Sequence, residues 1–163
     1  MAHDETDDGW PAAREPRSET RVIVAVHAAH HTLTRRLEIS TREHGLDASE
    51  ALVLNVVLRE PACAPWQIRS QVGLHASTLS SILGRLERDG QIERRPSDFD
   101  GRRFEVRLTR AGVIAAELGE FVIAEVEDEI AGYTSRAERH GAVAVYQASV
   151  AIGRRERGSA HWD

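Results

Sequence analysis

The stretch RRPSDFDGRRFEVRLTRAG, residues 94–112, concentrates positive charge around one Asp-Gly pair. It holds six arginines and three acids, whereas the whole chain carries a formal net charge of −5. The pair Asp100-Gly101 is a strong signal for a tight hairpin turn. Apolar and charged residues alternate after it, which is the period of a half-buried strand. We therefore expect a basic two-stranded hairpin that begins at Ile92. Its expected inward side chains are Phe104, Val106 and Leu108.

Two short helices are expected directly before this hairpin, at about 65–72 and 76–89. The tripeptide Gly73-Leu74-His75 joins them, and Gly90 ends the second, because glycine readily adopts the left-handed conformation that closes a helix. Two short helices with a glycine-containing turn, followed by a basic hairpin, are typical of a winged helix. In such a domain the second helix enters the DNA major groove, and the hairpin, or wing, reaches the neighbouring minor groove.

Longer helices are expected on the N-terminal side of this unit. One covers residues 20–44 and stops at Gly45, which favours the left-handed conformation after a helix. Its apolar stripe at helical spacing is Ile23, Val26, His30, Leu33 and Leu37. A second helix lies within 47–60, where Asp47 or Ser49 can cap its first turn.

Two more helices are expected after the hairpin. Thr109 caps the first, which runs to about residue 131 and breaks at Gly132. Its apolar face is expected at Ile114, Leu118, Phe121 and Val122. Ser135 begins the last helix, which runs through Ile152. The first and last helices of the chain are too apolar to remain exposed, so together they predict a dimer interface.

The expected fold class is mainly α with a small β-hairpin wing, a winged helix-turn-helix flanked by dimerisation helices. Its organisation is a disordered acidic arm at 1–19, a folded region at 20–155 and a polar tail at 156–163. Within the folded region the winged helix covers about 48–109, and the dimerisation helices cover about 20–44 and 110–155. No stretch approaches the roughly 20 apolar residues of a membrane span. No secretory signal pattern opens the chain.

The run SILGRLERDGQIERRPSDFDGRRFEVRLTRAG, residues 81–112, resembles the signature of the multiple-antibiotic-resistance-regulator (MarR) family. The matching motifs are Arg85-Leu86-Glu87, Gly90, Ile92, Arg94, Asp100-Gly101-Arg102 and Val106-Arg107-Leu108-Thr109-Arg110-Ala111-Gly112. The flanking helix order extends the resemblance from about residue 20 to 155. It implies a homodimeric winged-helix transcriptional regulator that binds double-stranded DNA at pseudo-palindromic operators. It also implies a repressor released by a small amphipathic or phenolic ligand.

Three positions depart from the family pattern. Arg69 stands where relatives have alanine at a tight packing point, and His75 stands where a serine-type cap is common. Ser81 stands where many relatives carry arginine. The front of the second helix of the pair, residues 76–81, is therefore uncharged, which shifts the expected DNA affinity toward the wing.

Hydroxyl and guanidinium groups are the expected DNA contacts, since both reach phosphates and base edges. The candidates are His75, Ser77, Thr78, Ser81, Arg85, Arg94, Arg95, Arg102 and Arg103. Asp100 is expected to orient a wing arginine. Arg94 and Arg95 either contact phosphate or pair with Glu87 and Glu93. The alternative function is a winged-helix dimerisation or protein-interaction module without operator binding, which the acidic net charge favours.

The segment VHAAHHTLTRRLE, residues 26–38, holds three histidines on one expected helix. His27 and His31 stand four residues apart, a spacing that can hold a metal, but Glu38 is the only further candidate ligand on that stripe. Together with His30 and Trp66, these histidines are candidates for a ligand pocket or an interface. Ordinary exposed histidines are the remaining interpretation. We expect no metal site and no cofactor.

Cys63 is the only cysteine, which excludes an intramolecular disulfide and favours a reducing, cytoplasmic compartment. No arginine or histidine adjoins it in the sequence, so a reactive thiol is not expected. Nucleophile-elbow, P-loop, zinc-protease and dinucleotide-binding motifs are absent. The sequence therefore predicts a binding protein and not an enzyme.

Overall fold

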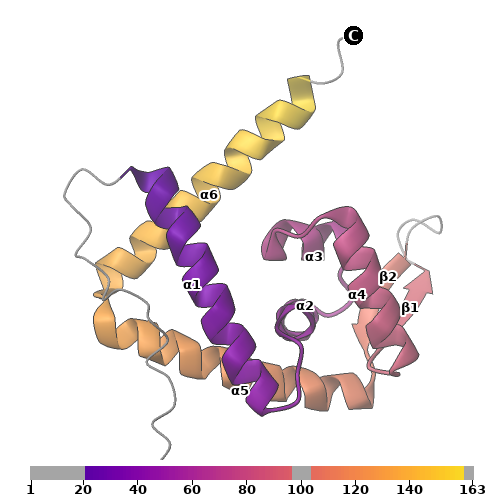
Figure 1. The fold of residues 1–163 in the computed structure, drawn as a ribbon. Helices are drawn as coiled ribbons and strands as arrows, with labels where there is room; N and C mark the ends of the chain where they lie inside the picture. The colour runs from indigo at the N-terminus through magenta and orange to yellow at the C-terminus, as the bar shows by residue number, and fades with distance from the viewer. Residues whose placement is uncertain (1–20, 97–103, 160–163) are drawn as a thin grey trace, which may run out of the picture. The chain divides into compact units, whose positions relative to one another are not determined.

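The computed structural model describes residues 21–96 and 104–159 (Figure 1). The elements are α1 (Val22–Glu43), α2 (Ala48–Arg59), α3 (Pro65–Val72), α4 (Ala76–Arg88), β1 (Ile92–Pro96), β2 (Phe104–Leu108), α5 (Arg110–Tyr133) and α6 (Arg136–Ser159). Their order is the one expected of a winged helix with flanking helices. The acidic arm, the Asp100-Gly101 turn, Arg102 and Arg103 lie outside the described residues.

Internal contacts divide the chain into two units, Met1–Arg35 and Arg36–Asp163, with the division inside α1. In the first unit, every described side chain of α1 up to residue 35 is exposed. The second unit contains the remainder of α1 and all other elements. Its hydrophobic core is built from α2, α3, α4, the hairpin and the first half of α5.

The junction of α1 and α2 follows from local sequence signals. Gly45 has a φ of 70°, and the amide of Leu46 donates to the carbonyl of Thr41, so α1 ends in a Schellman motif. Asp47 then caps α2, because its carboxylate accepts from the amides of Ser49 and Glu50. The predicted stop and the predicted cap are both confirmed.

The helix α2 is the central element of the second unit. Its buried side chains Ala51, Val53, Leu54, Val56 and Val57 face α5, α3 and the hairpin. On its outer side, Asn55 and Arg59 both donate to the carboxylate of Glu120 on α5, Arg59 at 2.7 Å. These hydrogen bonds fix the position of α2 along α5. The other helices of the winged helix and its hairpin pack against α2 in turn.

The strands β1 and β2 pair antiparallel, with Ile92 opposite Leu108 and Pro96 opposite Phe104. The loop before α3 adds one bridge, in which the amide of Val106 donates to the carbonyl of Cys63 at 2.9 Å. Val106 is buried as predicted. The expected alternation fails at the first pair of β2, because Phe104 is 36% exposed and Glu105 is buried. Phe104 instead packs against Arg94 at the edge of the hairpin.

One expectation for α5 is wrong in detail. Gly132 does not break the helix, which continues to Tyr133. One glycine costs a helix only about 1 kcal/mol, less than neighbouring residues supply. Of the four residues of the predicted apolar face, only Val122 is buried within the protomer. The buried side of α5 is Gly112, Ala116, Gly119, Val122 and Val126, where small residues allow close contact with α2.

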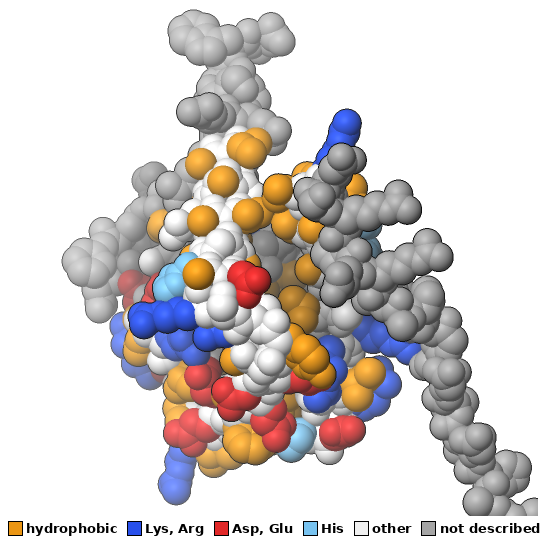
Figure 2. Space-filling view, turned by 90° about the vertical axis from the view of Figure 1, so that its left-hand side faces the viewer, with side chains coloured by type: hydrophobic (Ala, Val, Ile, Leu, Met, Phe, Trp, Pro, Cys, Tyr) orange, Lys and Arg blue, Asp and Glu red, His pale blue; other side chains and the backbone are white. Residues whose placement is uncertain are grey.

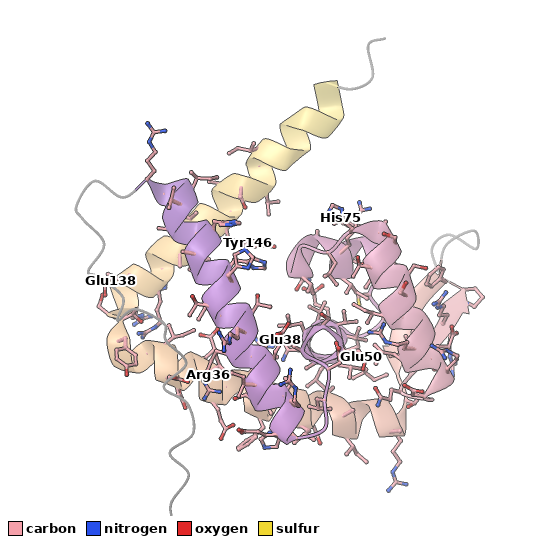
Figure 3. All side chains as sticks on the ribbon, viewed as in Figure 1. Arg36, Glu38, Glu50, His75, Glu138 and Tyr146 are labelled. Atoms are coloured by element: carbon pink, nitrogen blue, oxygen red, sulfur yellow. The ribbon has the colours of Figure 1, made fainter. Side chains whose placement is uncertain are left out.

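The last helix, α6, begins at a reciprocal cap. The Ser135 amide donates to the Glu138 carboxylate, and the Glu138 amide donates to the Ser135 hydroxyl. The helix extends to Ser159, into the segment expected as a polar tail. Tyr146, labelled in Figure 3, donates from its hydroxyl to the carbonyl of Ser70 in α3 at 2.8 Å.

Candidate DNA-binding surface

The helix α4 has one buried side and one exposed side. Leu79, Ile82, Leu83 and Leu86 pack into the core. The opposite side exposes Ser77, Thr78, Ser80 and Ser81. His75 occupies the N-cap position but accepts no hydrogen bond there, as its departure from a serine-type cap led us to expect. Figure 3 shows His75 at the junction of α3 and α4.

The exposed hydroxyls of α4 form an uncharged surface with hydrogen-bonding capacity. The Ser81 hydroxyl donates to the Ser77 carbonyl at 3.1 Å, within the helix. Its lone pairs therefore stay available as acceptors. A hydroxyl that accepts or donates suits both phosphate oxygens and base edges. Ser80 lies on the same side and belongs with the residues selected from the sequence.

Arg85 lies on the flank of α4 and is held by α2. Its Nε donates to the Glu50 Oε1 at 2.6 Å. The hydrogen bond to Glu50 raises the pKa of Arg85, so the guanidinium keeps its charge. Beside this pair, the N-termini of α2 and α4 border an open cavity of about 340 Å³. Ser49, Thr78 and Ser81 are among the residues that line it.

The two described arginines of β1 both pair with acids. Arg94 lies 3.2 Å from Glu87 of α4, and its guanidinium lies 5.1 Å from the centre of the Phe104 ring. Arg95 pairs with Glu93 of its own strand at 2.7 Å. The sequence left two alternatives for these arginines, contact with phosphate or pairing with Glu87 and Glu93. The structure shows the pairing. Such exposed pairs are weak, so both cations can also attract phosphate.

Trp66 lies in the first turn of α3, and its side chain is 58% exposed. It borders a cavity of about 280 Å³ between α3, α4 and the hairpin. The cavity residues are Pro65, Trp66, Arg69, Ala76, Leu79, Ser80, Leu83, Arg94 and Phe104. Aromatic, aliphatic and cationic side chains thus meet beside the exposed hydroxyls of α4.

The three candidate histidines lie on α1, in the first unit. The rings of His27 and His31 contact edge-to-face with centroids 4.6 Å apart, and His30 lies 5.5 Å from His31. All three side chains are exposed. Across residues 21–96 and 104–159, no three histidine, cysteine or acidic side chains converge as metal ligands do.

Cys63 is almost fully buried, beneath the hairpin. The pKa of its thiol is raised from 9.0 to about 11, chiefly by burial and in smaller part by the nearby carboxylates of Glu60 and Glu105. A thiolate is the reactive form of cysteine, so this thiol is unreactive near neutral pH.

Four residues of this surface were absent from the sequence-based selection: Glu50, Arg69, Ser80 and Phe104. Two of them could have been found from helical spacing. It places Ser80 on the same side of its helix as Ala76, and Arg69 on the same side as Trp66. Glu50 had none, since 35 residues separate it from Arg85. Phe104 was assigned to the core by strand alternation, and only the hairpin edge explains its exposure.

Residues 44–103 match the MarR family. The transcriptional regulator TtmR of Methylorubrum extorquens (strain PA1) is 31% identical over 99 residues, which are 60% of this chain and 51% of TtmR. The chain thus spans about half the length of this curated relative.

Solved structures share the fold. BpsR of Bordetella bronchiseptica has a TM-score of 0.67 at 18% identity, over 80% of this chain and 98% of BpsR. S. aureus MepR, solved with DNA, has a TM-score of 0.66 at 18% identity, over 82% of this chain and 99% of MepR. Residues 44–103 of this chain are thus similar to the MarR family, and the helix pair and hairpin have the winged-helix fold of these solved structures.

Proposed function

We propose that the chain is a homodimeric DNA-binding transcriptional regulator. The observation that carries the proposal is the surface of α4: an uncharged row of exposed hydroxyls, bordered by Arg85 on one side and Arg94 on the other. Such a row reads base edges without requiring a strongly basic protein. The relatives support it, since TtmR is a transcriptional regulator and MepR has been solved with DNA.

The dimer part of the proposal rests on exposed apolar side chains. Val22, Ile23, Val24, Val26, Phe121, Val143 and Ile152 are among those more than 40% exposed. Figure 2 shows such side chains lying in the open along a helix on the face that it presents. Large apolar side chains exposed in both units are unusual for a monomer. A symmetric dimer would cover them and would double the DNA-reading surface about a two-fold axis.

Release by a small molecule is the finer part of the proposal. BpsR is a relative whose DNA binding is regulated by 6-hydroxynicotinic acid. The candidate pocket residues in this chain are His27, His30, His31 and Trp66. Replacing His27 and His31 by alanine should leave DNA binding intact and weaken the response to an inducer. If the histidines bound metal instead, a chelator would change DNA affinity.

A salt-titrated mobility-shift assay on duplex fragments of the protein's own promoter region tests the main proposal. Operator binding should be specific, and its affinity should fall steeply with salt, because phosphate contacts release counterions. Absence of any specific complex at low salt would favour the alternative, a winged-helix interaction module without operator binding. No described helix is long and apolar enough to cross a bilayer.

A further inference from the structure

We propose that Tyr146 is a positioning residue for α4, the helix whose hydroxyls are proposed to read base edges. From α6 its hydroxyl bonds the carbonyl end of α3, and this bond fixes the separation of the two copies of α4 in the dimer. The inference rests on the proposed function and deepens it, because it names the residue that restricts the half-site spacing.

The last turn of α3 has carbonyl oxygens that the helix itself leaves without a donor. The amide of Gly73 donates to the Arg69 carbonyl at 3.0 Å and closes the helix. The Ser70 carbonyl accepts from the Tyr146 hydroxyl at 2.8 Å, and the Gln71 carbonyl lies 3.5 Å from the same hydroxyl. A phenol 76 positions away in the sequence therefore caps the end of α3.

A contact that holds the end of α3 also holds the front of α4. Only the turn Gly73-Leu74-His75 separates the two helices, and they pack against each other. Ser77 and Thr78 lie exposed in the first turn of α4, directly after this connection. A rotation of α3 about its carbonyl end would therefore carry these two hydroxyls with it.

The helix α6 has few other ties to the winged helix. The packing partners of α3 are α2, α4 and β2, and α6 packs broadly against no other element of the second unit. It follows α5 after the short junction Thr134-Ser135, about which it could swing. Tyr146 lies about three turns further along α6, so a hydrogen bond from it resists such a swing with a long lever.

The dimer connects this bond to DNA. On α6, Val143 and Ile152 are both more than half exposed, and a second protomer would cover such apolar side chains. In the proposed dimer, α6 therefore belongs to the shared interface and α4 to the DNA-binding surface. The half-site spacing that a dimer accepts follows from the distance between its two reading helices. The Tyr146 bond, which joins α6 to the helix pair, restricts that distance.

Selection of half-site spacing tests the inference with the full-length chain. The wild-type chain selects a duplex from a random pool, and the two half-sites are then moved apart or together in steps of one base pair. Tyr146→Phe keeps the ring and removes only the hydroxyl. It should reduce the preference for the best spacing over its neighbours about fivefold, the share that one net hydrogen bond supplies. Helical content, urea midpoint and dimerisation should stay as in the wild type.

Tyr133→Phe is the matched control. Tyr133 is the only other tyrosine of the chain, and it is 89% exposed at the end of α5. This variant should keep the wild-type spacing preference. The wild-type preference in Tyr146→Phe, or an affinity reduced equally at every spacing, would overturn the inference alone. A wild-type chain that selects no duplex is a different result, which rejects the proposed function and the inference with it.

A covalent tie supplies an independent readout. Ser70→Cys and Tyr146→Cys together place one thiol on α3 and one on α6, and a short bismaleimide joins them. The native thiol of Cys63 is almost fully buried and should stay unmodified. A monomer-sized band on a denaturing gel identifies the link within one chain. The open variant should tolerate several spacings, and the crosslinked one should regain the narrow preference. Equal tolerance in both forms would reject Tyr146 as the positioning residue.

Discussion

The Nε of Arg85 on α4 donates to the Oε1 of Glu50 on α2 at 2.6 Å. This bond connects the helix with the exposed hydroxyls to the N-terminus of α2, and it directs a guanidinium along the flank of α4. Glu50 is the less exposed partner, with 21% of its side chain accessible against 43% for Arg85. The arginine is therefore positioned, and part of its charge is neutralised, before DNA arrives.

Replacing Glu50 by glutamine should strengthen DNA binding. The glutamine oxygen can still accept from Arg85, so the geometry is kept while a negative charge near the phosphates is removed. We expect a gain on the order of fivefold at low salt, since one nearby surface charge is worth about 1 kcal/mol in water. Salt-titrated fluorescence anisotropy measures it, with Glu125→Gln on α5 as control. Weaker binding would mean that Glu50 acts through its charge on Arg85.

The wing should contribute a large share of the affinity, because the front of α4 is uncharged. Arg102→Ala should cost about 1–3 kcal/mol of operator binding and reduce the salt slope by about one. Asp100→Ala should also weaken binding, against simple charge counting, because we expect Asp100 to orient a wing arginine. Mobility shifts across a salt series check both. Wild-type affinity in Arg102→Ala, or tighter binding in Asp100→Ala, would contradict this role.

The protein should be a dimer at micromolar concentration. Ile23 is 77% exposed within the protomer, so replacing it with aspartate removes no contact inside the chain. Ile23→Asp should therefore shift sedimentation toward the monomer while helical content by circular dichroism stays the same. Val122 cannot contribute to such an interface, because it is fully buried against α2. A wild-type monomer would remove the basis for palindromic recognition.

Gly112 should tolerate no larger residue. An added Cβ would lie 1.8 Å from the carbonyl oxygen of Gln91, which also accepts from the Thr109 amide at 3.0 Å. Gly112→Ala should lower the free energy of unfolding by about 1–3 kcal/mol, the usual cost of overpacking. On the same helix, a Cβ added at Gly132 would meet no other atom within 4 Å. Gly132→Ala should therefore raise the free energy of unfolding by about 0.5–1 kcal/mol. Urea unfolding compares the two variants.

Cys63 should resist alkylation in the folded protein. Its thiol pKa is raised from 9.0 to about 11, chiefly by burial. A raised pKa means that the folded state favours the neutral thiol. The resulting stability is fully present below pH 9.0 and is lost as the pH rises toward 11. Iodoacetamide labelling at pH 8 should be slow when folded and rapid in urea. Fast labelling of folded protein would show that the hairpin opens readily.

The sequence alone determined the order of the elements and most of their boundaries, because these signals act over a few residues. The left-handed glycines 45, 73 and 90 end turns or helices where expected, and Asp47 and Thr109 cap the helices that follow them. The motif from Arg85 to Gly112 likewise carried the resemblance to the MarR family, whose model matches residues 44–103. The tight contact at Gly112 gives that motif's last glycine a physical reason.

Only the tertiary structure decided which faces are covered and which charges meet. The burial of α5 depends on α2, so helical periodicity placed Leu118, Phe121 and Val122 on one apolar face but could not show that only Val122 is covered within the protomer. The pairing of Glu50 with Arg85 joins residues 35 positions apart, and the exposure of Phe104 depends on its place at the hairpin edge. Hydrophobic spacing shows that a face is apolar, but burial is a property of the partner surface, which lies elsewhere in the chain or in a second protomer.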